Sequence, residues 1–200
     1  MALTSFQRRR RIALAALILL VVGAIPFVRP LGGGEMHEGL EQLGMFLIAA
    51  GILGRLWCTL YIGGRKAAEI VDTGPYAMCR NPLYFFSGIA ATGVGAQTGS
   101  ITIAALFGLG CLIAFAIVIR REEAFLAEQF GPAYARYCAR VPRLIPNPSL
   151  YRSPDAVTVK PHMLWATLKD GLVFFVSVPA FEAIEHFQAI GLLDPVIGFY

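Results

Sequence analysis

Charged residues are scarce in this chain and hydrophobic residues are abundant. Only 15% of the 200 residues are Asp, Glu, Lys or Arg, whereas 56% are hydrophobic, and this balance lies outside the usual range of soluble domains. The net charge of +4 comes from Lys and Arg at the ends of apolar segments, with no basic stripe, so nucleic acid is not an expected partner. The composition predicts an integral membrane protein built as one compact unit.

The sequence also lacks cysteines at the spacing of a disulfide framework and clusters of metal-ligating residues. The four cysteines show no CxxC or Cys/His spacing, which argues against a disulfide framework or a zinc site. The three histidines, His37, His162 and His186, are far apart, and we expect them to lack partners at helical spacing. The sequence therefore predicts no metal site.

Four apolar segments are present, at residues 12–28, 43–63, 83–96 and 101–119. The last two are separated only by Gln97–Ser100, and helices joined by so short a turn must be antiparallel neighbours. Arg55 interrupts the second segment, and a charge at membrane depth is costly enough to be a functional candidate. The alternatives are that Arg55 pairs with a carboxylate inside the bundle or snorkels.

Lys and Arg are concentrated in the leader, in residues 65–80 and after Arg120. The positive-inside rule then places the N-terminus, the 65–80 connection and the tail in the cytoplasm. In the tail, residues 171–181 are apolar for only eleven residues and contain Pro179, which is too short to span a membrane. We expect an interfacial or laterally packed helix there.

These observations predict an all-α polytopic membrane protein with four core transmembrane helices, a tight helical hairpin and cytoplasmic C-terminal helices. Residues 1–150 would form the membrane core with a cytoplasmic pocket, and residues 151–200 would be a C-terminal extension. The oligomeric state stays open.

Two polar stretches flank the hairpin. The first, residues 74–88, reads GPYAMCRNPLYFFSG, and the second, residues 120–146, carries an acidic pair, a Gly131-Pro132 break and several aromatic residues. Arg80 can hold a carboxylate or phosphate, an acidic side chain can bind an ammonium group or a ribose hydroxyl, and tyrosines offer flat surfaces for a base or a sulfonium cation. Tyr76, Tyr84, Tyr134 and Tyr137 are such tyrosines. Together the groups suit a zwitterionic, nucleotide-like ligand.

The stretch GPYAMCRNPLYFFSG followed by EEAFLAEQFGPAYARYCARVPRLIP resembles the two-part signature of the isoprenylcysteine carboxyl methyltransferase family, which is similar to the phospholipid methyltransferases. The resemblance covers residues 71–146. It implies an S-adenosyl-L-methionine-dependent enzyme with its cofactor at the cytoplasmic membrane face and Glu123 as structural support. By resemblance, the cofactor would contact Ile70, Val71, Tyr76, Asn81, Pro82, Leu83, Tyr84 and Glu122.

The chain departs from the family pattern at two positions. The His of the family's Arg-His-Pro is Asn81, which cannot carry a proton near neutral pH. The Arg that orients the substrate carboxylate in prenylcysteine enzymes is replaced by Val118, and Arg120 follows two residues later. Arg120 and Arg80 are the candidate catalytic residues. Because no base is evident, we expect methyl transfer to an anionic acceptor.

The predicted acceptor is lipid-like or prenylated and reaches the site from the surrounding membrane lipids, with an isoprenylcysteine carboxylate favoured. Two alternatives stay open. Sterol reductases that use NADPH share an Arg-His-Pro-x-Tyr region but are generally much longer. A non-catalytic membrane subunit could keep the fold without the chemistry.

Overall fold

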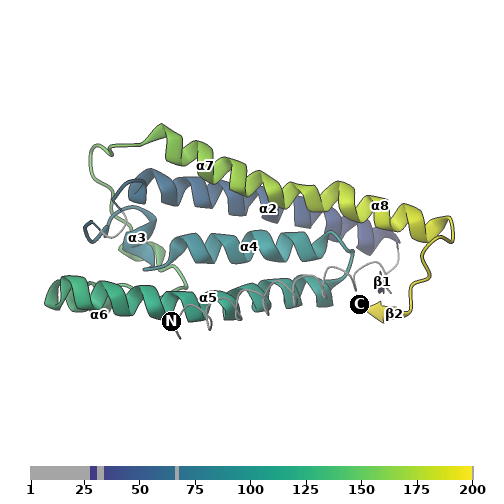
Figure 1. The fold of residues 1–200 in the computed structure, drawn as a ribbon, viewed down its shortest axis with the longest axis horizontal. Coiled ribbons are helices and arrows are strands. Elements are labelled where there is room, and N and C mark those ends of the chain that lie inside the picture. The colour runs from purple at the N-terminus through teal and green to yellow at the C-terminus, as the bar shows by residue number, and fades with distance from the viewer. Residues whose placement is uncertain (1–27, 31–33, 66–67, 200) are drawn as a thin grey trace, which may run out of the picture.

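Helices make up most of the structure, a computed structural model that describes residues 28–30, 34–65 and 68–199. The helices form an elongated bundle (Figure 1). In chain order they are α2 (Gly34–Ile62), α3 (Pro75–Met78), α4 (Pro82–Ala96), α5 (Ile101–Phe130), α6 (Pro132–Arg140), α7 (Pro161–Leu172) and α8 (Ser177–Ala189). Short 3₁₀ turns cover Pro148–Leu150 and Val173–Val176. The predicted all-α class is confirmed.

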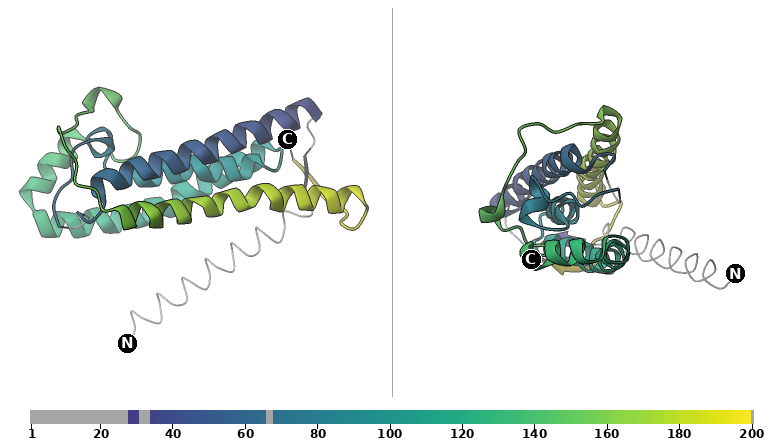
Figure 2. Two further views of the ribbon diagram at one scale, coloured as in Figure 1. Left: turned by 90° about the horizontal axis from the view of Figure 1, so that it is seen from above. Right: turned by 90° about the vertical axis from the view of Figure 1, so that its left-hand side faces the viewer.

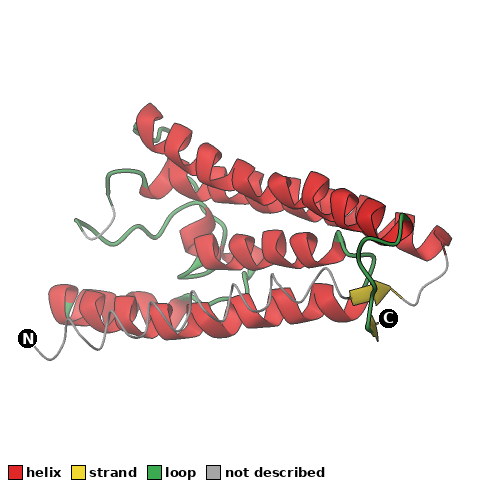
Figure 3. Cartoon of the chain, turned by 45° about the vertical axis from the view of Figure 1, so that its right-hand side comes forward, coloured by secondary structure: helices red, strands yellow, loops and turns green. Residues whose placement is uncertain are grey.

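The only strand pairing in the described part of the chain joins its two ends. Strand β1 (Val28–Pro30) pairs in parallel with β2 (Ile197–Phe199), and Arg29 lies opposite Gly198. These strands lie at one end of the bundle, whereas α3 and α6 lie at the other (Figures 1 and 3). We call the end with α3 and α6 the site end and the end with β1 and β2 the far end.

Among the described residues, three helical stretches are long and apolar enough to cross a membrane. They are α2, α5 and the continuous rod at residues 161–189, with 29, 30 and 29 residues, and each exceeds the roughly 30 Å of a bilayer's hydrocarbon core at about 1.5 Å per residue. The protein is therefore an integral membrane protein. The predicted first span, residues 12–28, lies outside the described residues except for Val28, which belongs to β1.

The predicted hairpin is present, and its shorter helix is enclosed by its neighbours. Helix α4 has 15 residues and packs against both α2 and α5, and the tail rod lies along α2 and also touches α4 through its 3₁₀ turn (Figure 2). Small residues make this possible: a Cβ added to Gly51 of α2 would lie 2.7 Å from the Cβ of Ala90. Such close approach of helix backbones is the usual basis of packing in membranes.

We expect Gly51→Ala to destabilise the bundle by about 1–3 kcal/mol, because the new methyl group would overpack the contact between α2 and α4. It would meet not only the Ala90 side chain but also backbone atoms of Phe86 and Ala90 at 2.8 Å, which cannot easily move. Thermal unfolding of detergent-purified protein measures the effect. Gly110→Ala on α5 is the matched control, since no atom lies within 4 Å of its added Cβ. Equal melting temperatures for the two variants would contradict this account.

The tail helix is longer than predicted, and it ends at a different end of the bundle from the one expected. Helices α7 and α8 continue through the 3₁₀ turn as one 29-residue rod, so the expectation of a segment too short to span is wrong. Pro179 is tolerated because it is the third residue of α8, in the first turn, where a missing N–H costs little. The expected lateral packing is present, with Gly171 against Ile52 of α2. Because β2 follows the rod, the tail ends at the far end and does not stay beside the 65–80 connection.

Arg55 hydrogen-bonds with a hydroxyl group and not with the carboxylate considered above. Its Nη1 donates to the Ser87 hydroxyl on α4, and its guanidinium lies 6.0 Å from the centre of the Phe174 ring. The charge thus joins α2, α4 and the tail rod inside the bundle.

Candidate functional site

The segment between α2 and α4 is held in place by backbone hydrogen bonds to the loop after α6. Gly74 N donates to Arg152 O at 2.7 Å, Arg80 N to Pro142 O at 2.9 Å, and Asn147 N to Met78 O at 2.9 Å. Gly74 has a φ of 59°, a conformation that favours glycine, and an added Cβ would lie 2.4 Å from the Tyr61 ring. These constraints place the two polar stretches of the sequence side by side.

A cavity of about 190 Å³ lies between these stretches at the site end. Its wall is formed by residues 69–71, by α3 and the Arg80 and Asn81 that follow it, by the last turns of α5 and by α6. Its lining residues are Ile62, Glu69, Ile70, Val71, Tyr76, Arg80, Asn81, Glu122, Glu123, Phe125, Leu126, Tyr134 and Tyr137. Six predicted site residues are therefore brought together: Ile70, Val71, Tyr76, Arg80, Asn81 and Glu122.

Four other predicted site residues lie outside this lining. Pro82 is fully buried at the start of α4, and Leu83 packs against the core formed by Tyr61, Val71 and their neighbours. Tyr84 lies against Phe115, with 4.6 Å between ring centroids, and hydrogen-bonds with Glu122. Arg120 is exposed and lines a separate hollow of about 400 Å³. Pro82, Leu83 and Tyr84 thus support the cavity wall from behind.

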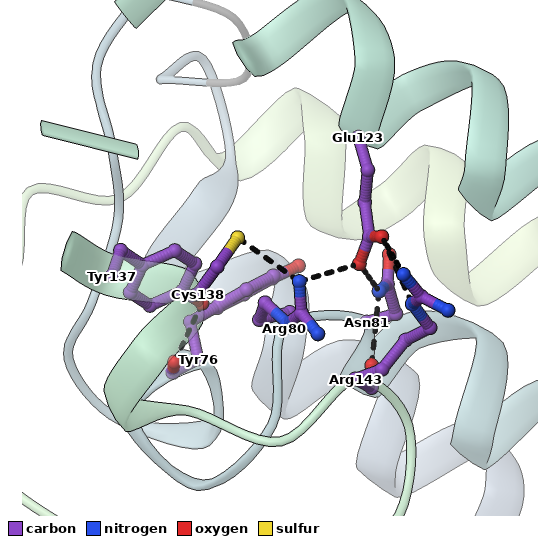
Figure 4. Close-up of polar contacts among 7 residues, drawn as sticks. All are labelled: Tyr76, Arg80, Asn81, Glu123, Tyr137, Cys138 and Arg143. Carbon is purple, nitrogen blue, oxygen red and sulfur yellow. Dashed lines mark hydrogen bonds and ion pairs between the residues drawn. The ribbon is translucent and has the colours of Figure 1, made fainter. Parts of the chain in front are cut away.

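Glu123 is the centre of a buried polar network (Figure 4). Its Oε1 lies 3.1 Å from Arg80 Nη1 and its Oε2 lies 2.9 Å from Arg143 Nη2. Asn81 Nδ2 donates to Glu123 Oε1 at 3.3 Å and to the Arg143 carbonyl at 2.9 Å. Arg80 Nη1 also donates to Cys138 Sγ at 2.9 Å. This network joins α5, α6 and the start of α4, as expected for a structural Glu123.

Two buried polar atoms at the cavity have no protein partner. Among the described residues, three buried side-chain atoms lack a hydrogen bond: Tyr76 Oη, Arg80 Nε and Arg55 Nε. The first two belong to residues that line the cavity. Leaving a buried donor unsatisfied costs about 1–3 kcal/mol, so a molecule bound in the cavity that accepted from these atoms would recover this free energy. Burial raises the pKa of the Tyr76 phenol well above its ordinary value, so its hydroxyl stays a neutral donor.

Helix α6 supplies the aromatic wall of the cavity. Tyr137 donates to the Tyr76 carbonyl at 2.8 Å, and the rings of Tyr134 and Tyr137 have centroids 5.9 Å apart. Burial raises the pKa of both phenols, so both remain neutral. Both were among the tyrosines that the sequence offered as flat surfaces for a ligand, and their i, i+3 spacing puts them on one face of α6.

Several other residues of the site were not predicted from the sequence. Phe125 and Leu126 lie one turn after Glu122 on α5, and helical spacing from Glu122 could have identified them. Arg143 lies twenty residues after its partner Glu123 in an irregular loop, and no local pattern could have identified it. Glu69 and Ile62 were also not selected.

Comparison with known proteins identifies the family. The sequence model of a protein family described as phospholipid methyltransferase matches residues 41–133 of this chain. The cobalt-zinc-cadmium resistance protein CzcN of Cupriavidus metallidurans is 34% identical over 198 residues, covering 98% of this chain and 91% of the relative. The nickel-cobalt-cadmium resistance protein NccN of Alcaligenes xylosoxydans xylosoxydans is 35% identical over 189 residues, covering 92% and 86%. The chain belongs to the phospholipid methyltransferase family. No solved structure matches it.

The matched region of this phospholipid methyltransferase family member contains most of the site. It runs from α2 through α3, α4 and α5 and ends at Ala133, one residue before Tyr134. Helix α6 and the tail rod therefore lie almost wholly outside the family match. The two relatives extend the similarity over nearly the whole chain.

Proposed function

We propose that this chain is an S-adenosyl-L-methionine-dependent methyltransferase whose cavity at the site end binds the cofactor. The observation that carries the proposal is the pair of unpartnered buried donors, Tyr76 Oη and Arg80 Nε, beside a cavity built from the family's own segment. A ligand with polar oxygens or nitrogens would satisfy them.

The chemistry of the lining fits the cofactor's parts. Tyr134, Tyr137 and Phe125 offer aromatic faces for an adenine ring or a sulfonium cation. The Glu122 carboxylate faces the same cavity and suits the cofactor's ammonium group or ribose hydroxyls. The volume of about 190 Å³ is below the roughly 300 Å³ of common ligand pockets, so the cavity has to widen when the cofactor binds.

The bound cofactor supplies a methyl group on a positively charged sulfur. The chain's residues hold and desolvate the reactants, and positioning of this kind can lower a barrier by roughly 7–11 kcal/mol in favourable cases. The amide nitrogen of Asn81 is already engaged by Glu123 and the Arg143 carbonyl. Asn81 therefore has no part in proton transfer, which favours an acceptor that is already an anion.

We further propose an amphipathic acceptor with an isoprenylcysteine-like carboxylate. Arg120 is exposed in the hollow of about 400 Å³ that also borders Arg80 and Glu123, and its cation can orient a carboxylate. By the positive-inside rule the site end faces the cytoplasm.

Calorimetric titration of detergent-purified protein with S-adenosylhomocysteine tests the proposal, with NADPH as the comparison ligand. We expect saturable binding of S-adenosylhomocysteine with one site per chain and no binding of NADPH. Binding of NADPH alone would assign the chain to the reductases. Binding of neither ligand would favour a non-catalytic subunit.

A further inference from the structure

A cluster of possible metal ligands lies at the far end, away from the cavity. His37 and Glu41 are one turn apart on α2, and Glu185 reaches them from α8. His37 Nε2 lies 3.4 Å from Glu41 Oε1 and 3.0 Å from Glu185 Oε1. The expectation that His37 lacks a partner at helical spacing is therefore wrong, because Glu41 is four residues away on the same face.

The three donor atoms lie close enough together to hold one metal ion. All of them lie within 4.8 Å of one another. With bonds of about 2.0–2.2 Å in a tetrahedral site, neighbouring ligand atoms stand about 3.4 Å apart. One imidazole nitrogen and two carboxylate oxygens suit Zn²⁺ and related first-row divalent ions. A fourth position would be filled by water.

The surroundings favour a cation and hold the imidazole in place. Glu38 and Glu182 are close enough to act electrostatically on Glu41, so Glu41 has three other carboxylates and one imidazole in its neighbourhood. The opposite side of the ring is packed on the turn between α4 and α5, since a Cβ added to Gly99 would lie 1.8 Å from His37 Nδ1. The His37, Glu41 and Glu185 side chains are 19%, 28% and 38% exposed, which leaves a path for an ion.

We propose that His37, Glu41 and Glu185 form a binding site for a divalent first-row transition metal such as Zn²⁺. The site lies about 38 Å along α2 from Ile62 at the cavity, at about 1.5 Å per residue, and so faces the opposite side of the membrane. It joins the first turns of α2 to the last turns of the tail rod, as Figures 1 and 2 show for the helices. A bound ion would fasten these two helices together.

Zinc titration of the full-length, tag-free protein in detergent, in competition with a chromophoric chelator, measures the binding. We expect one ion per chain and at least about a tenfold higher Kd for His37→Gln and Glu185→Gln, since loss of even an outer-sphere partner costs about 10–100-fold. His186→Gln is the matched control: it is the same residue type on α8, but its exposed ring lies beside Phe187. It should bind zinc as the wild type does.

Two further readouts separate coordination from a plain ion pair. Zinc should raise the melting temperature of the wild type and His186→Gln but not of His37→Gln, and Co²⁺ should give visible absorption bands that Glu185→Gln abolishes. Glu185→Gln keeps the size and hydrogen-bonding capacity of an exposed side chain, so it covers the case in which His37→Gln fails to fold. Equal zinc affinity in all variants, or no saturable binding by the wild type, would overturn the proposal and leave an ion pair between α2 and α8.

Discussion

Glu123→Ala is expected to destabilise the protein by about 3–5 kcal/mol, which is the usual cost of removing one partner from a buried ion pair. Arg80 would lose its carboxylate partner while its side chain stays only 13% exposed. Arg143 would lose its contacts to Oε2, and Asn81 would keep only the carbonyl of Arg143. Thermal or urea unfolding in detergent measures this loss.

The matched control is Glu128→Ala on the same helix. Glu128 is exposed, and surface carboxylates usually change stability by no more than about 0.5 kcal/mol. If Glu123→Ala and Glu128→Ala unfolded at the same temperature, the buried network around Glu123 would not have the structural role assigned to it.

Glu122→Ala is expected to have the opposite profile, with a large loss of cofactor affinity and an intact fold. A hydrogen bond to a charged group contributes about 1.5–3 kcal/mol, so the Kd for S-adenosylhomocysteine should rise by about 10–100-fold. The measurement is the same calorimetric titration, combined with a melting curve to show that the variant is folded.

Tyr84→Phe and Glu128→Ala complete this comparison. Tyr84 hydrogen-bonds with Glu122 from behind the cavity, so its loss should weaken binding less than loss of the carboxylate itself. Glu128→Ala should leave the affinity unchanged. An unaltered Kd in folded Glu122→Ala would remove this carboxylate from the proposed cofactor site, while binding by the wild type would keep the methyltransferase proposal open.

The helices could be predicted because their signals are local. Gln97–Ser100 left no room for anything but a tight turn, and Gly131-Pro132 marked the break between α5 and α6, where Gly131 has a φ of 51°. The tail was less predictable because its apolar run is short and because proline is disfavoured inside a helix. In the structure α8 begins at Ser177, directly after the 3₁₀ turn Val173–Val176, and this boundary places Pro179 in its first turn.

The site was predicted at the level of segments and less well at the level of side chains. A resemblance indicates which residues come near a ligand, but the contacts of Arg80 depend on tertiary structure. Its guanidinium, predicted to hold a substrate anion, is paired with Glu123, and this pairing joins residues 43 positions apart. The cluster of His37 and Glu185 was similarly hidden, because its members lie at opposite ends of the described chain.

The shortness of α4 gives the protein its recess. Helix α5 runs seven residues beyond Glu123 before it ends at Phe130, whereas α4 begins only at Pro82, beside the Glu123 network. Two more turns at the start of α4 would occupy the space now bordered by Tyr76, Tyr134 and Leu126. The cavity thus exists because α4 begins late at the site end, where the residues before Pro82, including Tyr76, Arg80 and Asn81, form part of its wall.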